Sequence, residues 1–357
     1  MTRICLNMIV KNEAPVIRRC LASVKPWVDH WVIVDTGSTD GTQALIREFM
    51  ADIPGTLNER PWRDFAFNRS EALELARAHG EHLLFIDADE TLVVPAGFGW
   101  PRLDADGYQL RCEVNGWKYF RNAIVATRLP WRWQGVLHEY LTCEQPHAWA
   151  TLEAPAIQVA HDGARGRDPD TYLRDIEVLE RAVRDEPANT RYRFYLAQSY
   201  RDAGRLEASR ERYRERAAMG GWEEERWFSL FQVVVLTERL GAPPAEVREA
   251  YLAAYQRRPS RAEPLCELAR YHRLRSEFAL AHLYAQQAAS IPYPTDILFV
   301  DAAVYSWRAL DELAVSASYV AGAREQGRAA MRRLLEGKKS PDSEQPRIEG
   351  NRAFYGL

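Results

Sequence analysis

Residues 4–10 read Ile-Cys-Leu-Asn-Met-Ile-Val and residues 31–34 read Trp-Val-Ile-Val, which gives two nearly continuous apolar runs. Between them, Ile17, Leu21 and Val24 recur at helical spacing. We therefore predict two buried strands joined by a helix. Such a unit requires a right-handed crossover and a parallel sheet. The opening of the chain thus predicts an α/β fold whose ligand site lies at the carboxyl ends of the strands.

Polar residues follow each apolar run. Residues 11–13 are Lys-Asn-Glu, residues 34–42 read Val-Asp-Thr-Gly-Ser-Thr-Asp-Gly-Thr, and residues 85–90 read Phe-Ile-Asp-Ala-Asp-Glu. The glycines of the second segment match neither the dinucleotide-binding pattern nor the P-loop, which excludes both of these sites. We expect the polar residues to meet at one edge of the sheet.

The two aspartates of the third segment, Asp87 and Asp89, form the most informative pair. A strand end directs alternate side chains the same way, so the two carboxylates can converge on one hard cation. Such a cation would bridge the diphosphate of a nucleotide donor. The pair alone is a weak signal, because a solvated acidic turn that caps a helix has the same residues. The preceding strand, helix and acidic turn make the metal interpretation stronger.

These three segments, in this order, resemble the glycosyltransferase family 2 domain, which has the GT-A fold. The resemblance covers about residues 1–165 and implies a Rossmann-like, mostly parallel sheet. It also implies a nucleotide-sugar donor, Mn²⁺ or Mg²⁺ as the divalent metal, and inversion at the anomeric carbon. By the same resemblance, the loop at residues 10–13 holds the base and the ribose, and Asp35 accepts a hydrogen bond from the imide of uracil.

The resemblance also assigns the remaining residues of the site. Asp87 contacts the ribose or the metal, and Asp89 holds the metal. Arg69, at the head of the next helix, matches the family arginine, although Ser70 stands where many relatives have Asn. The predicted nucleotide-sugar-binding residues are Val10, Asn12, Glu13, Asp35, Arg69, Asp87, Ala88 and His161. The predicted metal ligands are Asp87, Asp89 and His138.

Further strands are expected near residues 108–114, 123–127, 131–139 and 157–160. The third of these ends in His138-Glu139. An inverting transferase needs a base for the attacking group, and this segment resembles a branch of family 2 in which it lies against the donor phosphates. We assign Glu139 to the base or to the sugar hydroxyls, and His138 to the metal or the diphosphate. The alternative for His138 is a hydrogen-bonded structural histidine.

His161 closes the last of these strands and precedes a basic, glycine-containing segment with Arg165 and Arg167. Together they could reach the diphosphate if the segment closes on the donor. The alternative is a plain linker between domains.

Strand signals end near Asp170, and helical periodicity continues from there. Segments built on Leu-Ala-x-x-aromatic patterns recur at a period of about 34 residues, which is typical of tetratricopeptide repeats. We predict an all-α tetratricopeptide-like domain over residues 170–335, in which each helical pair is buried only by its neighbours. Residues 336–357 form a C-terminal tail, and residues 337–347 lack apolar content and are expected to be mobile.

Composition sets the remaining expectations. The 357 residues suffice for two domains, and the net charge of −3 gives no field for a polyanion, so we expect no nucleic-acid partner. The five cysteines show no C-x-x-C spacing and are expected to be reduced thiols. No apolar run reaches the ~18 residues of a membrane span, and the first strand leaves no room for a signal peptide. A cytoplasmic protein is expected.

We predict a glycosyltransferase (a hexosyltransferase) that moves a sugar from a UDP-sugar to a polypeptide side chain. A GT-A domain followed by tetratricopeptide helices resembles the sublancin-type peptide S-glycosyltransferases, whose appended helices help to present a polypeptide acceptor or to form a homodimer. One alternative is a transferase of lipopolysaccharide core or another glycan. Another is a repeat scaffold with a degenerate GT-A domain, against which intact Asp87, Asp89 and Arg69 argue.

Overall fold

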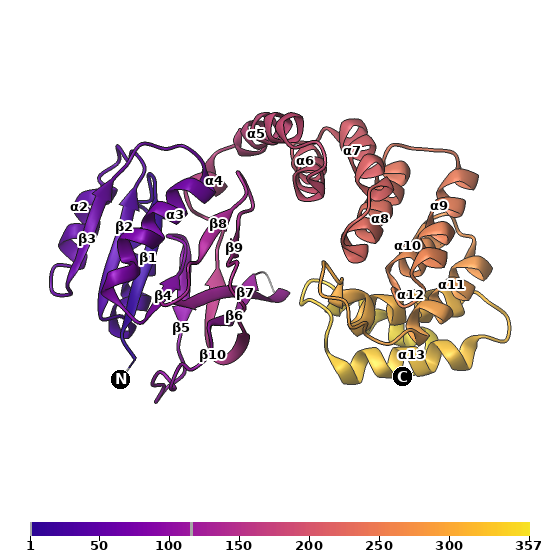
Figure 1. Ribbon diagram of the computed structural model, residues 1–357. Coiled ribbons are helices and arrows are strands. Elements are labelled where there is room, and N and C mark those ends of the chain that lie inside the picture. Colours follow the sequence, from indigo (N-terminus) through magenta and orange to yellow (C-terminus); the bar gives the residue numbers. More distant parts are fainter. Residues whose placement is uncertain (1, 115–116) are drawn as a thin grey trace. The chain divides into compact units, whose positions relative to one another are not determined.

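The computed structural model describes residues 2–114 and 117–357, with Trp117 and Lys118 described by their backbone alone. The chain divides into two compact units, Met1–Pro187 and Ala188–Leu357. Figure 1 shows a sheet with its helices in the first unit and helices alone in the second. No helix among the described residues has the length and apolar content to cross a membrane.

The first unit contains one mixed sheet, with strand order β3-β2-β1-β4-β7-β6-β10-β5, and a small β8-β9 ribbon. The first four strands in this order are parallel, whereas β7 pairs with β4 and β6 in antiparallel fashion. The strands are β1 (Ile4–Val10), β2 (His30–Asp35), β3 (Gly55–Glu59), β4 (His82–Phe85), β5 (Glu90–Val93), β6 (Gly107–Val114), β7 (Trp117–Ala126), β8 (Arg132–Gln134), β9 (Tyr140–Thr142) and β10 (Trp149–Val159).

Helices cover both faces of the parallel strands. Ile4 and Leu6 of β1 pack in one core cluster with residues of α1 and α2, whereas Cys5 packs with Leu73 of α3 in another. Because alternate residues of a strand point to opposite faces, this arrangement explains the nearly continuous apolar run of β1. The helices of this unit are α1 (Ile17–Val24), α2 (Thr42–Phe49), α3 (Phe65–Ala76), α4 (Ala164–Arg167) and α5 (Thr171–Asp185).

The second unit is a succession of antiparallel helices, as the repeat period predicts. An aromatic cluster around Phe194, Tyr213 and Trp227 joins α6, α7 and α8. The helices are α6 (Thr190–Asp202), α7 (Leu206–Ala218), α8 (Glu223–Arg239), α9 (Pro244–Arg257), α10 (Glu263–Leu274), α11 (Phe278–Ser290), the π-helix Val304–Arg308, α12 (Ala309–Ala317), α13 (Arg324–Gly337) and α14 (Gln345–Asn351).

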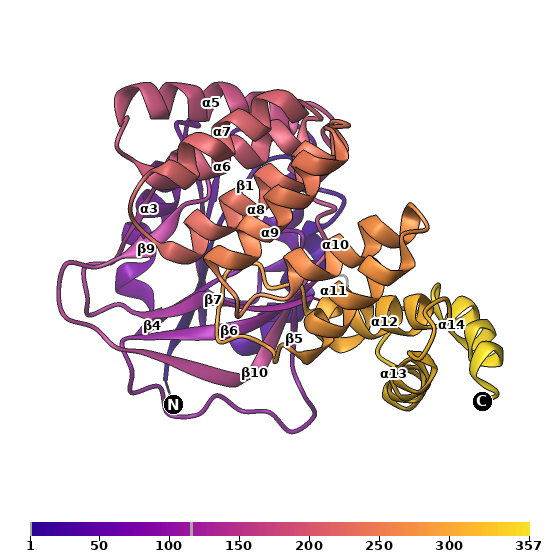
Figure 2. The ribbon, with the colours of Figure 1, turned by 90° about the vertical axis from the view of Figure 1, so that its right-hand side faces the viewer.

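The C-terminal tail packs on the last helices. Ile348 of α14 and Tyr355 beyond it are buried against Met331 and Leu334 of α13, and Figure 2 shows α12, α13 and α14 gathered at this end of the chain. Helix α14 begins at Gln345, so it takes up the last part of the segment that the composition predicts to be mobile.

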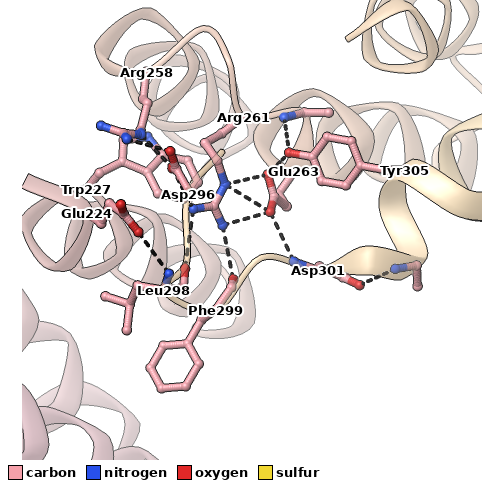
Figure 3. A network of polar contacts seen from close by, with 12 residues as sticks. Glu224, Trp227, Arg258, Arg261, Glu263, Asp296, Leu298, Phe299, Asp301 and Tyr305 are labelled. Carbon is pink, nitrogen blue, oxygen red and sulfur yellow. Dashed lines mark hydrogen bonds and ion pairs between the residues drawn. The ribbon is translucent and has the colours of Figure 1, made fainter. Parts of the chain in front are cut away.

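A buried ion network fixes the long connection between α11 and the π-helix (Figure 3). Arg261, whose side chain is 1% exposed, donates to Glu263 at 2.8 Å and to Asp296 at 3.1 Å. Its guanidinium also donates to the carbonyl oxygen of Phe299 at 3.0 Å and lies 4.2 Å from the ring centre of Trp227. The connection is therefore held by charge and not only by apolar packing.

Replacing Arg261 with Ala is expected to lower the free energy of unfolding of the helical unit by about 3–5 kcal/mol, because the buried Glu263 would lose its counter-charge and Asp296 would keep only Arg258. Urea denaturation followed by tryptophan fluorescence would measure the loss. Arg257→Ala is the matched control, since Arg257 pairs with Glu223 at an exposed surface and its removal should cost less than about 1 kcal/mol. Equal losses in the two variants would contradict the network's role.

Candidate active site

The loops after β1 and β2 are tied together at the carboxyl edge of the sheet. The Asn12 backbone N–H donates to Ser38 Oγ at 2.8 Å, and Asn12 Oδ1 accepts from the Thr39 N–H at 2.8 Å. The Glu13 N–H donates to Thr42 Oγ1 at 2.9 Å. Asn12 has a left-handed backbone, φ 57°, which asparagine tolerates better than most residues. The two loops thus form one fixed surface, as their position in the sequence predicts.

Asp35 is the last residue of β2, and only one of its two carboxylate oxygens accepts hydrogen bonds from the described residues. Its Oδ1 accepts from the Gly37 N–H at 2.9 Å, from the Ser38 N–H at 2.8 Å and from Gln43 Nε2 at 3.1 Å. Its Oδ2 is buried and has no hydrogen-bond partner among the described residues. Because a buried carboxylate oxygen without a partner is costly, this oxygen is suited to accept from a bound ligand.

Acidic and basic side chains alternate in a series of ion pairs that includes Asp87 of the Asp-Ala-Asp segment. Arg69 of α3 donates through Nε to Glu139 Oε1 and through Nη2 to Asp87 Oδ1, both at 2.6 Å. On the other side of Asp87, Arg121 of β7 lies 3.7 Å from Asp87 Oδ2 and pairs with both oxygens of the buried Glu90 at 2.8 and 2.6 Å. Glu90 Oε2 in turn accepts the Asp87 N–H at 2.9 Å.

This environment keeps the central pair charged. Burial raises the pKa of Asp87, but Arg69 and Arg121 outweigh it and bring the pKa below its usual value. Burial likewise lowers the pKa of Arg69, but Asp87 and Glu139 outweigh it and raise the pKa above the usual value. Both groups are therefore ionised near neutral pH.

Asp89 lies against the segment that follows β10. Its Oδ2 accepts the Gly163 N–H at 3.3 Å, and its carbonyl oxygen accepts from Arg19 Nη2 at 3.0 Å. A Cβ at Gly163 would lie only 2.9 Å from Asp89 Oδ2, so a glycine is needed for this approach. Arg19 also pairs with Asp162 at 2.6 Å. Neither Arg19 nor Gly163 is among the residues predicted from the sequence.

The basic segment around α4 contacts the loop after β1. The Ala164 N–H donates to Glu13 Oε2 at 3.0 Å, and Arg167 Nη2 donates to the carbonyl oxygen of Asn12 at 3.1 Å. Burial raises the pKa of Glu13 to about 7, although the Ala164 N–H acts in the opposite direction. His161, which precedes this segment, is exposed and has a left-handed φ of 56°.

The His138-Glu139 dipeptide does not lie in a strand. Only Arg132–Gln134 of the expected strand over residues 131–139 pairs, and the dipeptide lies in the bend between β8 and β9. His138 is exposed with a φ of 52°, whereas Glu139 is partly buried against Arg69. The side chains of the other two predicted residues, Val10 and Ala88, pack in the hydrophobic core.

The residues of this edge fit a metal that takes only one or two ligands from the protein and others from the phosphates of the substrate. In residues 2–114 and 117–357, no group of three or more His, Cys, Asp and Glu side chains is placed to hold a metal ion. The Asp87 carboxylate is already bound by arginines, which leaves Asp89 as the freer of the two. Mg²⁺ often binds through one or two carboxylates plus substrate phosphates, and such a site needs no protein cage.

Comparisons with known proteins show what the chain is similar to. Residues 5–93 match the sequence model of the family described as glycosyl transferase family 2. The chain is 29% identical over 310 residues to a TPR repeat-containing protein of Synechococcus elongatus. This alignment covers 80% of this chain and 71% of that protein. It is 34% identical over 207 residues to the SPbeta prophage-derived glycosyltransferase SunS of Bacillus subtilis. This alignment covers 54% of this chain and 48% of SunS, so the chain spans about half the length of that relative.

Solved structures match part of the chain at a low level of similarity. A thermophilic TPR protein of Thermus thermophilus matches 51% of this chain and 90% of its own chain with a TM-score of 0.35 and 15% identity.

Proposed function

We propose that the chain, whose residues 5–93 match the glycosyl transferase family 2 model, is a metal-dependent inverting glycosyltransferase that moves a sugar from a UDP-sugar to a polypeptide side chain. The matched domain and the relatives named glycosyltransferases confirm the prediction of a transferase. The donor, the metal and the acceptor are the proposal, and a homodimer and a cytoplasmic location stay predictions.

The unpartnered Oδ2 of Asp35 is the observation that supports a uridine donor. Three donors already occupy Oδ1 and fix the carboxylate, so a single oxygen is left for the base. Uracil offers a single N–H between two carbonyls, which suits one acceptor. Guanine would present two adjacent donors and would need both carboxylate oxygens.

The other site residues take roles that follow from their places. A divalent cation bound with the donor would stabilise the charge of the leaving diphosphate, with Asp89 as its carboxylate ligand. Asp87, held between Arg69 and Arg121, would face the ribose or the metal. Glu139 would take the proton from the acceptor. Asn12, Glu13, His138 and His161 would also contact the donor or its metal, whereas Val10 and Ala88, whose side chains pack in the core, would do so through their backbone.

The matches to two relatives named glycosyltransferases differ in length. The match to SunS runs over 207 residues, well beyond the family 2 segment, whereas the match to the lipopolysaccharide core biosynthesis glycosyltransferase LpsC of Rhizobium meliloti runs over 86 residues. The proposal of a polypeptide acceptor rests on the resemblance of the whole arrangement, a GT-A domain followed by tetratricopeptide helices, to the peptide S-glycosyltransferases.

A donor screen tests the proposal. The purified chain, with Mn²⁺ or Mg²⁺, is incubated with UDP- and GDP-sugars and with proteins of the host lysate, and modified proteins are identified by mass spectrometry. We expect a hexose-sized mass increase on protein with a UDP-sugar only. Transfer from GDP-sugars alone would show that the base assignment is wrong, and transfer to lipid or glycan alone would show that the acceptor assignment is wrong.

Replacing Asp35 with Asn is expected to weaken UDP binding by about 10- to 100-fold, because an amide at the Oδ2 position meets the imide N–H with a second donor. Isothermal titration with UDP measures the change. Asp52→Asn, which alters an exposed carboxylate at a surface ion pair, is the control and should leave UDP affinity unchanged. Unaltered UDP affinity in Asp35→Asn would remove Asp35 from the base site.

A further inference from the structure

Two cavities of the helical unit differ in how their charges are paired. One, of about 330 Å³, is lined by four arginines and three carboxylates, and every one of these arginines has an ion-pair partner. The other, of about 480 Å³, lies between the end of α11, the π-helix and the end of α13. Arg333 and Lys339 line this second cavity, and none of its described lining residues is acidic.

The cations of the second cavity are left without counter-charges. Within the part of the chain that the structure describes, the side chains of Arg333 and Lys339 form no ion pair or hydrogen bond. Both side chains are exposed. The tyrosines Tyr293 and Tyr305 stand beside them, with ring centres 5.2 Å apart and planes at 61°. The residue Tyr293 is 58% exposed, so its ring is open to a ligand.

The wall of this cavity is fixed from behind by the network of Figure 3. The hydroxyl of Tyr305 donates to Glu263 Oε2 at 2.8 Å and accepts from the Ala262 N–H at 3.0 Å. Arg258 pairs with Asp296 through two bonds, at 2.7 and 2.6 Å, which holds the connection that follows Tyr293. A buried ion network is weak evidence for net stability, so its main contribution here is to the position of the connection and of Tyr305.

We propose that this cavity binds an acidic segment of the polypeptide acceptor. Arg333 and Lys339 would pair with its carboxylates, and the open ring of Tyr293 would pack on an adjoining apolar side chain. We choose an acidic peptide because of charge complementarity. Unpaired cations beside two tyrosines favour a ligand that carries negative charges next to apolar side chains. That the bound polypeptide is the acceptor rests on the proposed function. Its binding to the cavity, however, does not require the nucleotide-sugar donor.

Binding is tested without any nucleotide sugar. The chain is titrated against a fluorescein-labelled peptide of alternating Glu and Leu, and against the same peptide with Lys in place of Glu, by fluorescence anisotropy. The double variant Arg333→Glu/Lys339→Glu reverses the two cavity charges. The matched control, Arg332→Glu/Lys338→Glu, makes the same change in net charge at exposed neighbours that do not line the cavity.

We expect the acidic peptide to bind and the lysine peptide not to bind. The cavity variant should weaken the acidic peptide about tenfold or more and the control variant less than about threefold. Hydrolysis of the donor in the absence of an acceptor should stay the same in both variants, which separates this inference from the proposed transferase activity. Equal weakening in the two variants would overturn the proposal. Displacement of the peptide by millimolar phosphate, but not by chloride of the same ionic strength, would overturn it in favour of a small phosphorylated ligand.

Discussion

Replacing Asp89 with Asn is expected to reduce sugar transfer by about 10³-fold or more and to abolish the dependence of donor binding on Mn²⁺ or Mg²⁺. The amide keeps the oxygen that accepts the Gly163 N–H, so the contact with the segment after β10 can persist. What is lost is the negative charge that a hard cation requires. Turnover and UDP affinity, each measured with and without metal, report the two effects.

The comparison variants make this result specific. Asp89→Ala should lose transfer to the same extent and should also lose the Gly163 contact. Asp104→Asn removes an exposed carboxylate that pairs with Arg102 and should leave transfer within about twofold, as surface changes of this kind do. Full turnover of the unaltered chain in the presence of EDTA would show that the proposed metal dependence is wrong.

The first half of the sheet could be predicted because its signal is local. The run at Ile4–Val10 is apolar on both faces, and only a strand covered on both sides by helices needs such a run. The strands of the second half of the sheet are harder to predict from the sequence. Strand β10 begins at Trp149, but its first residues mix polar and apolar side chains and face less of the core, so the sequence indicates only its buried end near Ile157.

The expected strand over residues 131–139 was wrong for a related reason. Trp131 and Leu137 are apolar in the sequence, and both are buried in the structure although they do not share one strand. Gly135, with a φ of 108°, interrupts the expected strand and starts the bend that carries Glu139 toward Arg69. A glycine with positive φ breaks strand geometry, and the sequence does not reveal which glycines take that conformation.

The candidate site divides in the same way. Asp35 is the last residue of β2, and Asp87 and Asp89 follow β4, so their places at strand ends could be predicted from the sequence. The pair of Arg121 with Glu90 depends on β7 lying next to β4 in the sheet, which no local pattern reveals. A lone arginine in a strand is most often solvated, so sequence alone gave no reason to select Arg121. The Asp296 contacts of Arg261 in the helical unit span 35 residues and were hidden for the same reason.

Replacing Glu139 with Gln is expected to lower turnover by about 10²- to 10⁴-fold with little change in donor affinity. Glutamine keeps the size of the side chain and an oxygen that can accept from Arg69 Nε, so the position of Arg69 and its bond to Asp87 should be preserved. The amide, however, cannot take a proton from the acceptor. Single-turnover kinetics at saturating donor, together with UDP titration, separates the chemical step from binding.

The nature of the acceptor changes the size of this effect. A thiol acceptor is already partly ionised near neutral pH and needs less help from a base, so the loss should be smaller with cysteine than with serine in the same peptide. If Glu139→Gln instead loses donor affinity and keeps turnover at saturating donor, the carboxylate belongs to sugar recognition. Glu90 could not then take over as the base, because both of its oxygens are held by Arg121 and its side chain is buried. The base would have to come from another exposed group at the same edge or from the acceptor itself.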